Sequence, residues 1–337
     1  MNGRQLLLIA GFIYLSFVGI ATGNDHPERV EPADTLRTAA LKELQEILYT
    51  QAEWVKVHAA EYLLWAGYPE GVKEEYLREE KRFGNQPPYR IGIWRVLAQA
   101  SSQPAERQQW TEKIREAFGD TAGMDRIHAA ETLAKLQMSP QAHYPTLTQK
   151  ALKSDNKPLA MYTLWAASYA ADESVQATRH KLLGLLTTPQ PDVAVKRMAA
   201  YILRHLKGLT AHQWQQLAQV ALSEPENSAA HVYLLSAAFV GAPANANTGL
   251  FKQVHETLLK AAFSPLKGNR TEMAAALAER GTLSNLPVLV ALLTDQNPLP
   301  GTGAASGEAI RKNPDQADVR AAAAYAILKI RQREQGR

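Results

Sequence analysis

Four gapless segments of one pattern constrain the fold of this chain more than any other feature. Each has a Lys or Arg three residues before an Ala-Ala pair, and a large apolar residue follows the pair. The segments are WVKVHAAEYLL (54–64), MDRIHAAETLA (124–134), AVKRMAAYILR (194–204) and DVRAAAAYAIL (318–328). The first three stand 70 residues apart, which corresponds to two units of about 35 residues each time. This recurrence predicts a repeat architecture.

Further helical segments occupy the positions between these four. They are YRIGIWRVLAQA (89–100), PLAMYTLWAASYA (158–170), AAHVYLLSAAFVGA (229–242) and TEMAAALAERG (271–281). The segment 209–222 shows how such a helix begins, because Thr210 and Gln213 form a capping box after Gly208 ends the preceding helix. Alternating strand patterns are essentially missing. The chain is therefore predicted to be all-α, an α-solenoid of antiparallel helical pairs.

The Ala-Ala pairs have a physical purpose in such an array. Methyl side chains permit neighbouring helices to approach closely. The basic residue one turn earlier is expected to reach carbonyls or acids of a neighbouring repeat, and Asp192 is expected to supply such an acid in the third unit.

The pattern of an acid, then Val-Lys or Val-Arg, then Ala-Ala, resembles the HEAT repeat, in particular the short lyase-type HEAT-like repeat. The residues that carry the resemblance are Asp192, Val195, Lys196, Ala199, Ala200 and Ile202, and in the last unit Val319, Arg320, Ala323, Ala324 and Ile327. The resemblance covers most of the chain and implies a superhelix of HEAT-like pairs. Scaffolds, adaptors and a few enzymes share this repeat, so the resemblance implies little about function.

The N-terminus carries a predicted export signal. Arg4 precedes an apolar run over 6–20, and the small residues Ala21 and Gly23 fit a cleavage site. The run is shorter than the about 20 residues that a membrane span needs. We therefore expect a signal peptide at 1–23 and a periplasmic or secreted protein. The chain has no cysteine, which excludes disulfides, thiolate metal sites and a Cys nucleophile.

The rest of the chain divides into three predicted parts. The repeat array covers 24–293, a Gly/Pro-rich loop covers 294–317, and the final repeat helix with its basic tail covers 318–337. A loop of this length is usually functional or disordered, and its lack of aromatic residues favours disorder.

Charge and motifs exclude several classes of function. The net charge is only +4, without a clustered basic stripe, so nucleic-acid binding is not expected. No other stretch is apolar enough to span a membrane, and no GxSxG, HExxH or dinucleotide-binding pattern occurs. No cofactor is expected, and the oligomeric state is left open.

A candidate binding surface lies on the repeated helix. Residues 54, 58, 61 and 65 are spaced i, i+4, i+7 and i+11, which puts them on one stripe of a helix. In HEAT-like arrays this helix lines the concave face. The candidate groove then comprises Trp54, His58, Glu61, Trp65, Arg90, Trp94, Arg95, His128 and Glu131. Tryptophan stacks on sugar rings, and arginine binds carboxylates or sulfates through two hydrogen bonds.

Two other interpretations of the His and Glu residues remain open. Pairs at i and i+3 on a helix can simply be hydrogen-bonded on a solvated face. The helix RIHAAETL also distantly resembles the metal-binding helix of deoxyhypusine hydroxylase, a HEAT-like di-iron enzyme. Here the adjacent His-Glu pair of that family is absent, and two of the four aligned units have Met198 and Ala322 in place of the His. The resemblance to the iron site is therefore poor, and no metal is expected.

The predicted function is non-catalytic binding or scaffolding of a protein or acidic glycan partner through the concave surface, because solenoids usually act in this way. The alternative is a helical polysaccharide-processing enzyme, a lyase or hydrolase, that uses His58, Tyr62, Tyr89 and Arg90 of an N-terminal groove. No nucleophile, base and orienting residue can be assigned to one another, so the sequence favours binding.

Overall fold

The structure is a computed structural model that describes residues 33–188, 192–294 and 314–336. The expected signal peptide at 1–23 lies outside these residues, and so does the part of the expected loop between 295 and 313. The described residues belong to one compact unit, Ala33–Arg337.

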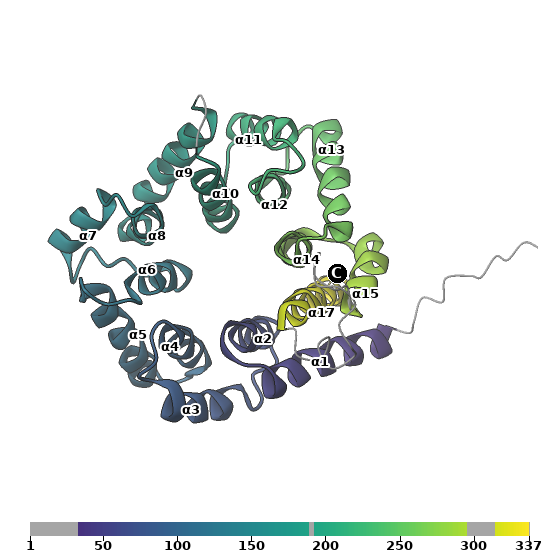
Figure 1. The fold of residues 1–337 in the computed structure, drawn as a ribbon. Coiled ribbons are helices and arrows are strands. Elements are labelled where there is room, and N and C mark those ends of the chain that lie inside the picture. Colours follow the sequence, from purple (N-terminus) through teal and green to yellow (C-terminus); the bar gives the residue numbers. More distant parts are fainter. Residues whose placement is uncertain (1–32, 189–191, 295–313, 337) are drawn as a thin grey trace, which may run out of the picture. The chain divides into compact units, whose positions relative to one another are not determined.

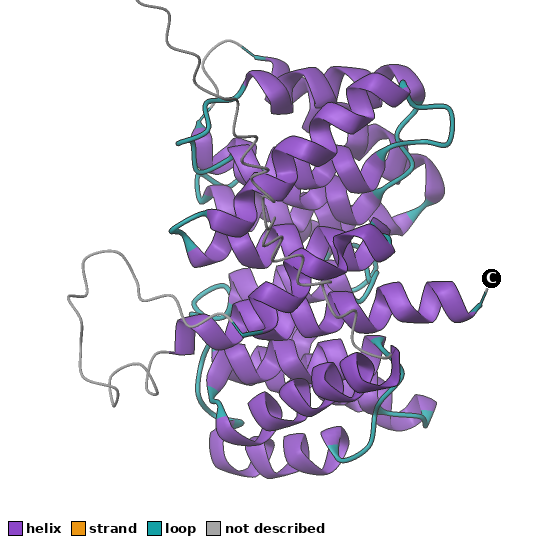
Figure 2. Ribbon diagram, turned by 90° about the vertical axis from the view of Figure 1, so that its right-hand side faces the viewer, coloured by secondary structure: helices purple, strands orange, loops and turns teal. Residues whose placement is uncertain are grey.

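The all-α class is confirmed, because helices are the only regular elements of the described residues (Figure 2). Eight helices carry the repeated pattern or its intermediate segments and are called the inner helices: α2 (Glu53–Trp65), α4 (Tyr89–Ala100), α6 (Arg126–Lys135), α8 (Lys157–Ala167), α10 (Val193–Leu206), α12 (His231–Gly241), α14 (Lys267–Arg280) and α17 (Pro314–Gln335). The outer helices alternate with them: α1 (Ala33–Thr50), α3 (Val72–Phe83), α5 (Pro104–Gly119), α7 (Pro145–Leu152), α9 (Asp172–Thr187), α11 (Ala211–Ser223), α13 (Thr248–Leu259) and α15 (Leu286–Leu293).

The inner helices form a closed circle within this unit (Figure 1). Each inner helix contacts the next one along the chain, from α2 through to α14. The last helix, α17, packs against α14 and α15 on one side and against α1 and α2 on the other. The C-terminal helix therefore joins the two ends of the array, and the inner helices surround a common centre.

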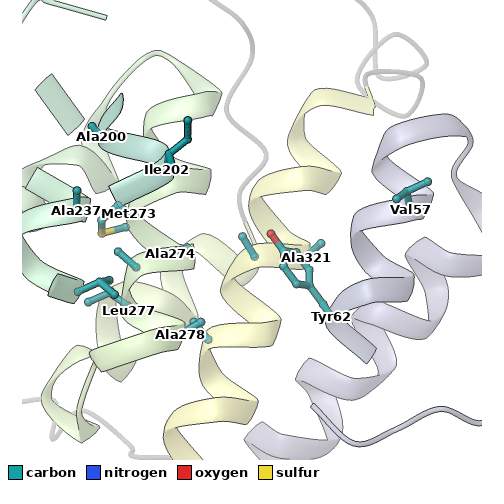
Figure 3. Close-up of a cluster of buried hydrophobic side chains, with 14 of the residues drawn as sticks. Val57, Tyr62, Ala200, Ile202, Ala237, Met273, Ala274, Leu277, Ala278 and Ala321 are labelled. Carbon is teal, nitrogen blue, oxygen red and sulfur yellow. The ribbon is translucent and has the colours of Figure 1, made fainter. Parts of the chain in front are cut away.

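Small residues allow the inner helices to pack closely. Every alanine of the four repeated Ala-Ala pairs has a relative exposure of 0%. Figure 3 shows further small side chains, among them Ala274, Ala278 and Ala321, in the core where α14 and α17 pack. Gly92 of α4 has the same role against α2, since a Cβ atom at this position would lie 2.8 Å from a methyl carbon of Val57.

The basic residue of each repeated segment holds an inner helix to an outer one, as expected. Its partner is an acid in three units and a backbone carbonyl in the other. The pairs are Lys56 with Glu79 (2.9 Å), Arg126 with the carbonyl of Phe118 (2.9 Å), Lys196 with Glu224 (2.6 Å) and Arg320 with Glu43 (2.6 Å). The recurrence of Lys or Arg is thus explained by architecture.

Helix ends follow the sequence signals with two corrections. The capping box of Thr210 and Gln213 is confirmed. Asp192 does not pair with a basic residue of a neighbouring repeat, because its carboxylate caps α10 by accepting from the backbone N–H groups of Ala194 and Val195. The final helix begins at Pro314, ahead of the predicted start at 318. Within the described ranges, no helix is both long and apolar enough to cross a membrane.

Candidate ligand-binding cavity

The inner helices line a partly open cavity of about 730 Å³, here called the central cavity. Its lining comes from α2, α6, α8, α10, α12, α14 and α17, mostly from their C-terminal halves. A volume of this size lies within the range of about 300–1,000 Å³ that is typical of small-molecule sites. The circle of helices therefore creates a site large enough for a small ligand.

Two columns of the aligned repeats supply much of the lining. The alignment position of Glu61 is occupied by Glu131, Tyr201 and Tyr325 in the other three segments, and all four residues line the cavity. The column of Trp65 continues as Lys135, His205 and Lys329, and these also line it. Sequence reasoning followed the stripe only where His and Glu recur, so it missed the members in the third and fourth segments. The repeat register was the signal that would have found them.

Four of the predicted site residues line the central cavity, namely His58, Glu61, Trp65 and Glu131. The others, Trp54, Arg90, Trp94, Arg95 and His128, are not among its lining residues. Trp54 instead stacks on His128 with 5.0 Å between ring centroids, and the Arg95 guanidinium lies 5.9 Å from the Trp54 ring. These three form the layer behind the cavity wall.

Arg90 and Trp94 hold α4 to its neighbours. Arg90 Nε lies 2.5 Å from a carboxylate oxygen of the buried Asp125, and its guanidinium lies 5.3 Å from the Trp94 ring. Lys113 of α5 lies over the same ring at 5.4 Å. Trp94 is only 7% exposed. In this arrangement both residues are engaged in packing rather than in lining the cavity.

Glu61 is buried, contrary to its predicted place on an open groove. Its two carboxylate oxygens accept hydrogen bonds from Arg95 at 2.7 and 2.8 Å, and both residues are 1% exposed. Burial raises the pKa of Glu61, but the charges of Arg95 and Lys135 outweigh this and lower it. The physical reason for the burial is the partner: Arg95 lies on α4, where sequence reasoning did not pair it with Glu61.

This buried pair also positions an aromatic ring of the wall. Gln99 donates to Glu61 at 2.9 Å and accepts at 2.7 Å from the indole N–H of Trp65. Trp65 remains 41% exposed although its N–H is satisfied. The network therefore fixes Trp65 while its ring stays accessible.

The remaining acids of the lining are also matched by cations. Glu131 lies 3.0 Å from Lys135, and although burial raises its pKa, Lys135 and Arg95 together lower it to about 2. Arg204 is 3.1 Å from Glu272 and 2.8 Å from Glu279. All four acids of the cavity thus have basic partners, and the lowered pKa values of Glu61 and Glu131 keep these two carboxylates ionised at neutral pH.

Aromatic groups gather on two sides of the cavity. Tyr62 and Tyr325 stack with centroids 4.7 Å apart, and Trp65 packs beside them. On α8 and α10, His205 stacks on Trp165 at 4.9 Å. Since α10 is four inner helices away from α2 in either direction, the two groups face the cavity from opposite sides.

Four tyrosines of the cavity lining have hydroxyl groups without a hydrogen-bond partner among the described residues: Tyr62, Tyr162, Tyr233 and Tyr325. Burial raises the pKa of each phenol, that of Tyr325 to about 12. The phenols are therefore neutral and can both donate and accept hydrogen bonds.

The two histidines of the lining differ in their surroundings. His58 Nδ1 lies 2.9 Å from a carboxylate oxygen of Asp318 on α17, so closure of the circle brings this pair together. Burial, together with the charge of Arg204, lowers the pKa of His205 well below its usual range, and its imidazole is neutral.

These residues do not fit the di-iron site of the hydroxylase. His58 is bonded to Asp318, and the carboxylates of Glu61 and Glu131 are taken by basic residues. No cluster of three or more potential ligands occurs within the described ranges. No known protein family matches the chain, and a search of curated proteins finds no match either.

Proposed function

We propose that this chain is an exported HEAT-like repeat protein that binds a saccharide in its central cavity without catalysing a reaction on it. The observation that carries the proposal is the set of tyrosine hydroxyls that have no hydrogen-bond partner among the described residues and lie beside stacked aromatic rings. The binding surface is then the inner face of the helical array, and the export signal at 1–23 would place it in the periplasm or outside the cell.

A saccharide satisfies the chemistry of this lining better than an apolar ligand does. Each polar group that a ligand buries without a partner costs free energy. A sugar offers several hydroxyls that can pair with neutral phenols, while its C–H faces stack on aromatic rings. The rings of Tyr62, Tyr325 and Trp65 form a platform for such stacking. An apolar ligand would leave the phenols and the ion pairs of the wall without water.

Isothermal titration calorimetry with neutral and acidic oligosaccharides tests the proposal. The informative variant combines Tyr62→Phe, Tyr162→Phe and Tyr325→Phe, which removes three hydroxyls and keeps the rings. Because each hydrogen bond contributes about 0.5–1.5 kcal/mol, we expect binding to weaken by about 10-fold or more. Tyr49→Phe is the control, since Tyr49 lies on the outer helix α1 and is 54% exposed. Unchanged affinity in the triple variant, or no saccharide binding at all, would overturn the proposal; a protein partner on another surface would give this result.

A polysaccharide-processing enzyme is a second candidate, and the pair of His58 and Asp318 favours it. A hydrogen bond from Nδ1–H to the carboxylate leaves Nε2 of a cavity-lining histidine as a proton acceptor. Two residues of the original enzyme hypothesis are engaged elsewhere, since Tyr89 donates to Glu79 and Arg90 pairs with Asp125. Mass spectrometry of oligosaccharides after incubation separates the candidates. Products formed by the wild type and not by His58→Gln would indicate an enzyme, and intact oligosaccharides would indicate binding alone.

A further inference from the structure

One cation of the central cavity differs from all others in its contacts. Lys135, Arg204 and Lys207 are ion-paired with cavity glutamates. Lys329 donates to the backbone carbonyl of Trp65, and Arg333 donates to backbone carbonyls at the end of α14. Arg197 has neither a carboxylate nor a carbonyl partner among the described residues, and it is exposed. An arginine in this state has its hydrogen-bond donors available to a ligand.

The position of Arg197 is nevertheless fixed by a neighbour. Its guanidinium carbon lies 5.6 Å from the centroid of the Tyr233 ring on α12, at cation–π distance. Tyr233 in turn reaches toward α14, because a Cβ atom at Gly268 would lie 3.9 Å from the Tyr233 hydroxyl oxygen. Thr271 follows one turn later on the same helix, lines the cavity, and has a buried hydroxyl without a partner in the described part of the chain. Three consecutive inner helices, α10, α12 and α14, therefore each present a hydrogen-bond donor to the cavity.

The charge of the lining favours an anion at this point. Six lysines and arginines line the cavity against four glutamates, and each glutamate already has a basic partner. An added anion would meet an excess of positive charge. It could also bind Arg197 without first breaking an ion pair among the described residues. A carboxylate matches the fork of a guanidinium with two parallel hydrogen bonds.

We propose that Arg197, Tyr233 and Thr271 form a carboxylate site, so that the ligand of the central cavity is a saccharide that contains a uronic acid. The inference rests on the proposed saccharide-binding function. The guanidinium of Arg197 binds the carboxylate, the Tyr233 and Thr271 hydroxyls donate to it, and the sugar ring extends toward the aromatic platform of Tyr62 and Tyr325.

Calorimetry with an oligogalacturonate and with its methyl ester tests the site, because the ester keeps the sugar chain but replaces each charged carboxylate with a neutral methyl ester. For Arg197→Ala we expect about 10- to 100-fold weaker binding of the acid, since a charge-assisted pair is lost. The ester should change by less than about 3-fold. Arg197→Lys keeps the charge but loses the two-pronged geometry, so it should fall between the wild type and Arg197→Ala. Lys252→Ala on α13 is the control, because it removes one positive charge from a side chain that is 74% exposed.

The outcomes separate the inference from the proposed function. If acid and ester bind the wild type equally, or if Arg197→Ala binds the acid as well as the Lys252→Ala control does, the carboxylate site is refuted while saccharide binding stands. If a sulfated saccharide binds and the oligogalacturonate does not, the site is an anion site of another class and the uronate is refuted. If no saccharide binds, both the function and the carboxylate site are refuted.

Discussion

Removal of the Glu61 carboxylate should destabilise the protein far more than removal of a partly exposed acid. Arg95 loses the two hydrogen bonds at 2.7 and 2.8 Å, and its one remaining side-chain hydrogen bond within the described residues goes to the Thr132 hydroxyl at 3.2 Å. The Arg95 side chain is 1% exposed, so its charge would be left buried without its carboxylate partner. Breaking a buried pair in this way costs about 3–5 kcal/mol. We therefore expect Glu61→Ala to lower the free energy of unfolding by that amount.

Urea denaturation followed by circular dichroism measures the change. Glu80→Ala is the matched control, because Glu80 pairs with Lys113 at 2.8 Å while the two side chains are 24% and 34% exposed. A partly exposed pair near the surface contributes about 0–1 kcal/mol, so this variant should stay close to the wild type. The double variant Glu61→Leu/Arg95→Met should recover most of the loss, since no unpaired charge remains buried. A loss below about 1 kcal/mol for Glu61→Ala would refute the account of this pair.

Three other changes test the structure at separate points. Glu131→Gln should reduce the loss of stability on acidification by about 3 kcal/mol, because the pKa of Glu131 is about 2 in the folded protein and 4.5 in the unfolded chain. The stabilisation by the ionised carboxylate is complete above pH 4.5 and disappears as the pH falls to 2. Urea titrations of the wild type and the variant across this range measure the difference, and parallel changes in the two proteins would contradict the prediction. Gly92→Ala should lower the free energy of unfolding by about 1–3 kcal/mol, since its Cβ would lie 2.8 Å from a methyl carbon of Val57. Gly184→Ala on α9, where a Cβ would meet no atom within 4 Å, should raise it by about 0.5–1 kcal/mol. Equal shifts of the melting temperature in the two variants would be inconsistent with this packing. A chain that ends before α17 should lose its cooperative thermal transition, because α17 joins α14 to α1 and α2, and a retained sharp transition would show that closure is dispensable.

The helical architecture was accessible from the sequence because its cause is local. Close packing requires the Ala-Ala pairs, and the basic residue before each pair must reach an outer helix, so both features recur in the chain. The repeat register likewise carries the cavity columns of Glu61 and Trp65.

Closure of the circle and the pairs that it creates have no local signature. His58 and Asp318 are 260 residues apart, and nothing in either segment indicates the other. The burial of Glu61 depends in the same way on Arg95, which lies on another helix. Arg197 was missed because its distinguishing property is the lack of a carboxylate or carbonyl partner among the described residues, which only the folded chain reveals.

The most direct test of saccharide binding in the central cavity is a crystal structure of residues 24–337 grown with the oligogalacturonate. The expected result is electron density for a sugar between the inner helices, with a pyranose ring against Tyr62 and Tyr325 and a carboxylate at Arg197. A saccharide bound only outside the circle of inner helices, or a cavity that stays filled by protein side chains while calorimetry reports binding, would contradict it.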